Sequence, residues 1–423
     1  MPAGTADGGD LGTPPRDGIV SVVDQVAISA GNFATALILA RVLDKSEFGL
    51  FVVASALMVL AVSLQEGFIL QPLAVSGAGV DDAVFGRLLG AQMILQVVFL
   101  LAMSGGAFAV ALVWEPLRPI AAPLAVASGL FQAQEFCRRA LYCRGRVVAA
   151  CLNDAISYDL QAIIIGFLAW SVGLSVGHAL WMVALTSLIA VVAGLGQLRP
   201  FLTAAPDSLR SVLRQGLEIG KWTGSVRVVN ALAYDAQPFI LTALAGLPSA
   251  AGLGVVMRIL GPLHLLDRPI YVYYVPAALR AFSREGPRGS RRIVAGAWWL
   301  MGPPYLVYVL GVILFAPLVL RVAFGEQYVQ HADALRILAV SSGLGFGGAL
   351  LWIVANVRRL HALWLVATVS SAVVIYTVGI YLISHHGLLG AALSTLASDV
   401  VGTVVFLLGL RLGTRRLASA RAA

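Results

Sequence analysis

Charge, cysteine and the motifs of common enzyme sites are all scarce in this sequence. Only 12% of the 423 residues are charged, which is too few to cover the surface of a water-soluble chain of this length. The spacings GxxxxGK(S/T) and HExxH do not occur, so the chain lacks a phosphate-binding loop and a zinc-protease helix of the usual kinds. These absences argue against a soluble enzyme and against a built-in ATPase.

The three cysteines, Cys137, Cys143 and Cys151, have a spacing that fits no zinc-binding pattern. All three fall near a predicted cytoplasmic loop, where thiols stay reduced. We therefore predict free thiols, and we expect neither a metal site nor a cofactor.

Apolar stretches long enough to cross a bilayer are what the sequence has in abundance. Hydrophobic residues make up 59% of the chain, and the mean hydropathy is +0.88. A helix needs about 20 apolar residues to cross the hydrocarbon core, and continuous runs favour helices over a β-barrel. The predicted fold is an all-α integral membrane protein with about twelve transmembrane helices. The expected spans are residues 18–41, 49–75, 84–113, 119–137, 147–171, 177–198, 217–245, 249–279, 293–323, 333–356, 359–384 and 388–411.

The distribution of basic residues sets the expected topology. Loops on the side of the N-terminus hold 21 of the 29 Lys and Arg residues, against 5 on the opposite side. Positively charged loops stay in the cytoplasm, so we predict a bacterial cytoplasmic (inner) membrane protein with both termini cytoplasmic. The net charge of +8 thus orients the chain and does not indicate nucleic-acid binding.

The two halves of the chain resemble each other. Residues 40–55 and 243–258 match with a shift of 203, and six of sixteen positions are identical. Because six spans precede the second copy, both halves have the same orientation, as in repeats related by an axis along the membrane normal. We predict two pseudo-symmetric six-helix bundles around a central cleft. The expected domains are a disordered cytoplasmic tail (1–17), an N-terminal bundle (18–198), a cytoplasmic linker (199–216), a C-terminal bundle (217–411) and a basic cytoplasmic tail (412–423).

Ionisable and polar residues inside the predicted spans are the candidates for function. A charge at mid-bilayer costs roughly 2.5–3.5 kcal/mol, so it usually faces a cavity or a partner. Polar residues recur at helical spacing in spans one and seven, and we predict that both stripes face the cleft. The predicted substrate-binding residues are Arg227, Arg268, Arg258, Asn230, Tyr234, Gln25 and Asn32, and the predicted ion-coupling residues are Asp24 and Glu66.

The remaining charged residues near or inside the spans are interpreted as structural rather than functional. Ion pairs inside a bundle can act as plain structural contacts, and this alternative stays open for every charge named above. The residues interpreted as packing or helix-end groups are Asp235, Glu135, Asp159 and Asp399, and those interpreted as topology markers are Arg138, Arg139, Arg144 and Arg146.

Arginine is informative about the cargo. Its guanidinium group keeps its charge, and its planar fork matches phosphate oxygens. A membrane cavity with fixed arginines therefore predicts an anionic cargo.

Several stretches resemble one known family. LARVLDKSEFGLFVVASALMVLAVSL resembles the first helical hairpin of the polysaccharide (O-antigen type) flippases, within the multidrug/oligosaccharidyl-lipid/polysaccharide exporter superfamily. The stretches CRRALYCRGRVVAA (137–150), AFGEQYVQHADALRILAVSSGL (323–344), VRRLHALWL (357–365) and LLGAALSTLASDVV (388–401) are similar to later segments of that family, in order. The resemblance implies a V-shaped cleft between two six-helix bundles, alternating access and a polyprenyl-pyrophosphate-linked glycan as cargo.

The sequence thus predicts a non-enzymatic flippase that moves a lipid-linked oligosaccharide across the membrane for surface polysaccharide synthesis. The expected partners are this cargo, membrane lipids and, as candidates, a glycan polymerase and chain-length machinery, with no nucleic acid. Three alternatives stay open: a cation-coupled multidrug exporter of the same superfamily, a membrane-embedded glycan polymerase or ligase, and a scaffold of a glycan assembly complex that transports nothing.

Overall fold

The computed structural model describes residues 15–171, 173–202 and 208–422. The side chains at 15–19, 21–22, 222, 223, 226, 233, 264, 268, 272, 361 and 412–422 lie outside the description. The predicted tails and the middle of the predicted linker therefore fall wholly or partly outside the described residues. All regular structure within the described residues is helical, which confirms the all-α fold.

The first half of the chain forms eight α-helical segments joined into rods by short π and 3₁₀ turns. They are α1 (Pro15–Val42), α2 (Lys45–Gln65), α3 (Gln71–Gly77), α4 (Asp82–Val113), α5 (Ala121–Cys143), α6 (Val147–Asp154), α7 (Gln161–Ser171) and α8 (Val176–Leu198). The joining turns are η1 (Glu66–Leu70), η2 (Glu115–Ile120), η3 (Ala155–Leu160) and, after α8, η4 (Arg199–Phe201).

The second half is built on the same plan. Its α-helices are α9 (Leu209–Asn230), α10 (Gln237–Ala245), α11 (Leu247–Leu260), α12 (Leu263–Pro269), α13 (Val275–Glu285), α14 (Pro287–Phe324), α15 (Ala332–Val357), α16 (His361–Val374) and α17 (Ile380–Ala422). Its short turns are η5 (Ala231–Asp235), η6 (Ile270–Tyr274), η7 (Glu326–His331) and η8 (Ile375–Gly379). Gly387 takes a positive φ of 53° inside α17 and turns the chain there, so η8 and the start of α17 belong to one rod and the rest of α17 to the next. Counted as rods, these elements agree with about twelve spans.

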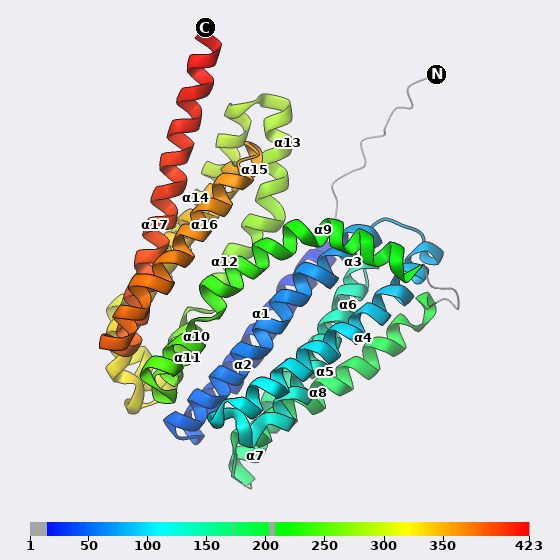
Figure 1. Ribbon diagram of the computed structural model, residues 1–423, viewed down its shortest axis with the longest axis vertical. Coiled ribbons are helices and arrows are strands. Elements are labelled where there is room, and N and C mark those ends of the chain that lie inside the picture. Colours follow the sequence, from blue (N-terminus) through cyan, green and yellow to red (C-terminus); the bar gives the residue numbers. More distant parts are fainter. Residues whose placement is uncertain (1–14, 172, 203–207, 423) are drawn as a thin grey trace.

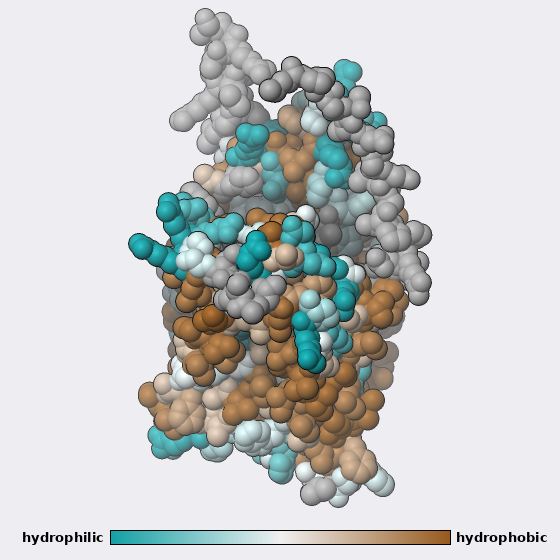
Figure 2. Space-filling view, turned by 90° about the vertical axis from the view of Figure 1, so that its right-hand side faces the viewer, coloured by the Kyte–Doolittle hydropathy of each residue, from teal (hydrophilic) through white to brown (hydrophobic). Residues whose placement is uncertain are grey.

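Apolar side chains cover the outside of the rods. Within the described residues, 8 helices are long and apolar enough to cross a membrane. Trp299 and Val307 of α14 are 74% and 71% exposed, an exposure that suits contact with lipid rather than water. A broad apolar surface lies between hydrophilic rims on the face that Figure 2 shows.

Five of the short turns are π-helical, namely η1, η3, η5, η6 and η8. Three of them have a cause in the sequence, because Pro72, Pro238 and Pro276 each come within three residues of the end of a turn. A proline has no N–H to donate to the carbonyl four residues earlier, and its ring clashes with that carbonyl. That earlier residue lies inside η1, η5 and η6 in turn, so the wide turn relieves the clash.

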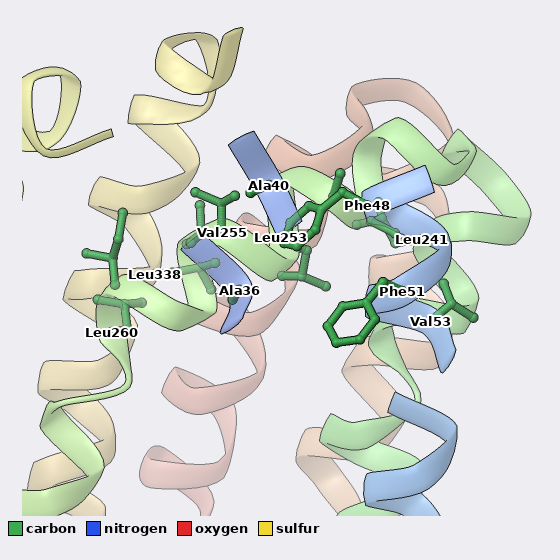
Figure 3. Close-up of a cluster of buried hydrophobic side chains, with 14 of the residues drawn as sticks. Ala36, Ala40, Phe48, Phe51, Val53, Leu241, Leu253, Val255, Leu260 and Leu338 are labelled. Carbon is green, nitrogen blue, oxygen red and sulfur yellow. The ribbon is translucent and has the colours of Figure 1, made fainter. Parts of the chain in front are cut away.

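The halves stand side by side, and α1 begins at the same end of the molecule where α17 finishes (Figure 1). At the opposite end the halves are packed together. A single apolar core joins Ala40 and Phe48 of the first half to Leu253 and Leu338 of the second (Figure 3). Polar contacts seal the same end, since Arg41 Nε donates to the Ala323 carbonyl at 2.8 Å.

Close backbone approach also marks this closed end. A Cβ added at Gly49 of α2 would lie 2.0 Å from the Leu247 carbonyl oxygen of α11, and one added at Gly254 would lie 2.3 Å from a Val52 methyl. Only glycine fits at these two positions, so α2 and α11 touch across the boundary between the halves.

Helix α9 links the two halves near the other end. Although it opens the second half of the chain, its glycines rest on the first half, where Gly224 meets Gly67 of η1 and Gly220 meets Phe68. Figure 1 shows α9 running over the α3 and α4 end of the first half before the chain descends into α10.

Candidate functional site: a cavity between the halves

A cavity of about 810 Å³ lies where the two halves meet. Its wall is formed by α1 and α2 of the first half and by η5, α10, α11, α12 and α14 of the second. Most lining side chains are apolar, and Phe33, Phe48, Phe51 and Tyr308 supply aromatic surface. A central opening between the halves is where the sequence predicted one.

Arg258 carries the positive charge of this cavity. It lies in the last turn of α11, is only partly exposed and is flanked in the sequence by the apolar lining residues Met257 and Ile259. No ion pair formed by the described residues includes it. The C-terminal end of a helix carries a partial negative charge that stabilises a nearby cation. This partial charge offsets only part of the guanidinium charge, so an anionic ligand can still bind there. Arg258 was predicted to bind substrate, and its place in the cavity wall is consistent with that.

The π turn η5 brings further polar groups to the same wall. Tyr234 and Asp235 lie at its end, and Ser63 Oγ of α2 donates to Asp235 Oδ2 at 3.0 Å across the boundary between the halves. The Tyr376 hydroxyl donates to the Leu232 carbonyl at 2.7 Å, which gives one carbonyl of the turn a partner. Asp235 was interpreted as a packing or helix-end residue; it is indeed the last residue of η5, but it also lines the cavity, which that interpretation did not predict.

The polar stripe of the first helix reaches the cavity only in part. Ser29 and Asn32 line it, as predicted for Asn32. Gln25 does not, because its amide donates to Asp24 Oδ2 at 3.2 Å. Gln25 lies closer to the start of α1 than any lining residue.

Asp24 does not face the cavity either. It is 1% exposed, accepts a hydrogen bond from the Tyr142 hydroxyl at 2.8 Å and lies 3.7 Å from Arg138 Nη2. On the helix it shares a face with Gly31, two turns later, and Gly31 packs so closely on η3 that an added Cβ would lie 2.9 Å from the Tyr158 backbone. This face of α1 is turned into its own bundle.

Arg138 is the centre of that buried group. Its Nε lies 2.7 Å from Asp154 Oδ2 and its Nη1 lies 3.3 Å from Glu135 Oε2. Gln134 also donates to Asp154 at 2.8 Å. We call Asp24, Glu135, Arg138 and Asp154 the Arg138 cluster. The interpretation of Arg138 as a topology marker was wrong, because it assumed a helix that ends at residue 137, whereas α5 continues to Cys143.

Glu66 is also paired inside the first half. Both of its carboxylate oxygens lie 2.8 Å from Arg139 Nη2, and Gln71 Nε2 donates to it at 3.3 Å. The prediction that Glu66 faces the cleft was wrong, because it lies outside the cavity wall.

The stripe predicted on span seven is divided by η5. Tyr234 and Gln237 line the cavity, but Arg227 and Asn230 do not. A π turn holds one more residue than an α turn, so it rotates the residues before it by about 100° relative to the residues after it. Arg227 is therefore exposed beside Gly67 of η1, whose added Cβ would lie 3.5 Å from the Arg227 Cβ. The Arg268 side chain lies outside the described residues, so its predicted role is untested.

Two smaller features have structural explanations. Cys137, Cys143 and Cys151 are free thiols, as predicted. The spacing GxSxG, which marks nucleophile elbows in hydrolases, occurs once, at 173–177. Here Ser175 caps α8, and its side chain accepts a hydrogen bond from the His178 backbone N–H at 3.3 Å. This is an ordinary helix N-cap.

No family model matches this chain, and no curated protein matches it. Solved structures do resemble it. An inward-facing conformation of a multidrug resistance MATE family transporter of the MOP superfamily has a TM-score of 0.74 at 15% identity, over 95% of this chain and 99% of that one. An outward-facing conformation of a multidrug resistance MATE family transporter has a TM-score of 0.64 at 17% identity, over 97% of this chain and 96% of that one.

A third similar structure is a MOP superfamily transporter from Pyrococcus furiosus, with a TM-score of 0.62 at 16% identity over 94% of each chain. Its description states that the reversed polarity of its binding pocket suggests a different function. Identities this low show a common fold. The chain thus has the fold of these MATE-type transporters, and both the exporter superfamily and the polysaccharide flippase subfamily stay predictions.

Proposed function

We propose that this chain is an alternating-access transporter that flips a polyprenyl-pyrophosphate-linked oligosaccharide from the cytoplasmic to the outer leaflet. The fold, the cavity between the halves and the packed end formed by α2 and α11 support the transport part of the proposal. The TM-score is higher with an inward-facing than with an outward-facing relative, which is consistent with a state whose outer side is closed.

The observation that carries the cargo class is the guanidinium of Arg258 in the cavity wall, which forms no ion pair with the described residues. An anionic pyrophosphate would supply that missing partner, in a low-dielectric setting where charge-assisted hydrogen bonds are strong. Asn32, Tyr234 and Gln237 add hydrogen-bonding groups for a sugar, and the apolar remainder suits the start of a prenyl chain.

The test is transport by Arg258→Gln in proteoliposomes that contain a fluorescent prenyl-pyrophosphate glycan. Losing a hydrogen bond to a charged group costs roughly 1.5–3 kcal/mol, so we expect the apparent KM to rise about 10- to 100-fold. Arg258→Lys keeps the charge but lacks the planar fork, so its apparent KM should lie between that of the wild type and that of Arg258→Gln.

The matched control is Arg280→Gln, because Arg280 is an exposed arginine in the middle of α13, outside the cavity wall. It should transport like the wild type. Normal glycan transport by Arg258→Gln at equal protein levels would remove the anionic-cargo proposal.

A second candidate is a cation-coupled multidrug exporter, and it is favoured by Asp235 and by the aromatic side chains of the cavity wall. Organic cations bind to carboxylates and to aromatic faces. In this case Asp235→Asn would abolish drug resistance in cells, whereas Arg258→Gln would not weaken it. Loss of activity in Arg258→Gln alone would therefore indicate the flippase, and loss of activity in Asp235→Asn alone would indicate the multidrug exporter.

We also propose that the Arg138 cluster couples movement to a cation, which keeps the predicted role of Asp24 but not that of Glu66. Three carboxylates surround one guanidinium group, so their formal charges cannot all be balanced without a bound proton or metal cation. Transport that ignores both proton and sodium gradients in vesicles would contradict this role.

A further inference from the structure

Three buried glutamines meet between α2, α4 and α5 of the first half, and a fourth lies one helical turn along α4, outside the cavity wall and the Arg138 cluster. Gln65 Nε2 donates to Gln96 Oε1 at 2.9 Å and to the Gln132 backbone carbonyl at 2.7 Å. Gln92 lies one helical turn before Gln96 on the same face of α4. All four side chains are at most 3% exposed, so Gln65 ties three helices together inside the bundle. We call these residues the glutamine cluster.

Three amide oxygens of the glutamine cluster lack a hydrogen-bond partner among the described residues. They are Oε1 of Gln65, Gln92 and Gln132, and the Gln96 Nε2 donor also lacks a partner among these residues. Buried acceptors are nearly always satisfied in native proteins, because each one has given up its hydrogen bonds to water. Gln96 lies close to the middle of α4, and its neighbours Val97 and Val98 are exposed on the outside of that helix. The unpaired oxygens therefore lie at a depth where lipid offers them no donor.

We propose that the glutamine cluster binds a monovalent alkali cation through the amide oxygens of Gln65, Gln92 and Gln132. Neutral carbonyl oxygens are hard ligands that can replace the hydration shell of such an ion. Among the described residues the cluster has three unpaired acceptors and one unpaired donor, Gln96 Nε2, so it favours a cation over an anion. A transition metal prefers imidazole or thiolate. A divalent ion is normally held by carboxylates, and the cluster itself contains none.

The surrounding charge also favours a cation. Among the described residues, the ion pairs on α1, η1, α5 and α6 join four carboxylates to two guanidinium groups, those of Asp24, Glu66, Glu135, Asp154, Arg138 and Arg139. A further pair of the first half, Arg144 with Asp82, adds one charge of each sign. Glu135 lies one helical turn from Gln132 on α5, so part of this negative charge lies close to the cluster. A bound cation gains from this field, whereas an uncharged water molecule does not.

The position of the site gives it a structural consequence. Gln65 is the last residue of α2, directly before η1, and Gly67 of that turn packs on Gly224 of α9. A cation held by Gln65 would stiffen the base of the turn on which the second half rests. This inference does not depend on the proposed function, because binding is measured without cargo.

The test is the thermal unfolding of the purified protein in detergent, in the chlorides of Na⁺, K⁺, Li⁺ or the bulky cation N-methylglucamine at equal ionic strength. We expect the Tm to rise by about 2 °C in the preferred alkali ion when its concentration is about five times its Kd. The increase should saturate, and calorimetric titration with the same salt should give the same Kd.

Two variants locate the site. Gln132→Met and Gln92→Met each replace an unpaired oxygen with a group of similar volume, so both should fold and lose the cation-dependent increase in Tm. Gln132→Glu supplies a charged ligand of the same shape and should lower the Kd about tenfold. The matched control is Gln161→Met, because Gln161 is a buried glutamine of the same half whose amide donates to Thr35 at 3.3 Å. It should keep the full increase.

Equal Tm values in all four salts would overturn the proposal and leave water as the occupant of the cluster. An alkali-dependent increase that survives in both methionine variants would overturn it as well, because the ion would then bind elsewhere. A loss of the increase in Asp24→Asn alone, with the methionine variants unaffected, would assign the ion to the Arg138 cluster.

Discussion

The two halves of this molecule share an order of helices but treat their buried charges in opposite ways. In the first half Arg138 and Arg139 are each held by carboxylates of the same half. In the second half Arg258 lies in the cavity wall, and no ion pair of the described residues includes it. Removing one partner of a buried ion pair is costly. An unpaired charge beside a cavity is available to a ligand. The buried arginines thus tie helices together in the first half, whereas Arg258 of the second half stays open to a ligand.

The largest effect that would test this comparison is expected from Arg138→Gln. The change leaves Asp24, Glu135 and Asp154 inside the bundle without the guanidinium group that they surround. Breaking a buried pair from one side costs roughly 3–5 kcal/mol, so we expect a strongly lowered Tm and poor yield after purification in detergent.

The paired experiment is the Tm of Arg258→Gln. Here no carboxylate loses a partner, and a desolvated charge is removed, so stability should stay equal or rise slightly while transport falls. Equal destabilisation by both changes would show that the halves do not differ in the way proposed.

Much of this fold could be predicted from sequence because it depends on hydrophobic runs. The predicted spans 84–113, 147–171 and 177–198 closely match α4, the rod from α6 to α7, and α8. Each hydrophobic run is a local signal, and such runs recur along the chain. An error of a few residues at the end of one predicted span therefore does not change the predicted fold. The same reasoning placed Arg258, Asn32 and Tyr234 at the cavity.

Rotation about the helix axis could not be predicted. The interpretation of span seven assumed unbroken α-helical periodicity, and η5 broke it between Asn230 and Tyr234. Pro238 was a usable signal, because its missing N–H disturbs the turn four residues earlier. For Asp24 no such signal exists, since a single charge does not reveal which neighbouring helix holds its partner.

A middle-sized effect is expected where the halves touch. Gly49→Ala would place a Cβ against the Leu247 carbonyl oxygen, and overpacking of this kind costs roughly 1–3 kcal/mol. Because the contact joins the two halves, the cost should fall on the state in which this end is closed. We expect faster labelling, by a maleimide applied from this end, of a cysteine introduced at Ser55 in the cavity wall, after the native cysteines are replaced by serine.

Gly105→Ala is the control for Gly49→Ala, because an added Cβ at Gly105 meets nothing within 4 Å. It should leave the labelling rate unchanged. Slower labelling in Gly49→Ala, or the same acceleration in both variants, would mean that the α2 and α11 contact does not hold this end closed.

The smallest effect is expected from the polar link between Asp235 and the first half. Ser63→Ala removes the hydrogen bond from Ser63 Oγ to Asp235 Oδ2, which is worth about 1 kcal/mol at a partly buried site. Because the bond spans the boundary between the halves, its loss should shift the labelling rate of the same Ser55 cysteine about fivefold without a large change in Tm. Asp235→Asn, in which the amide oxygen can still accept the bond, should shift it less, and the double variant should show that the two effects are not additive. Additive effects would mean that Asp235 acts independently of Ser63. The Asp235 carboxylate would then have no part in holding the two halves together through this bond.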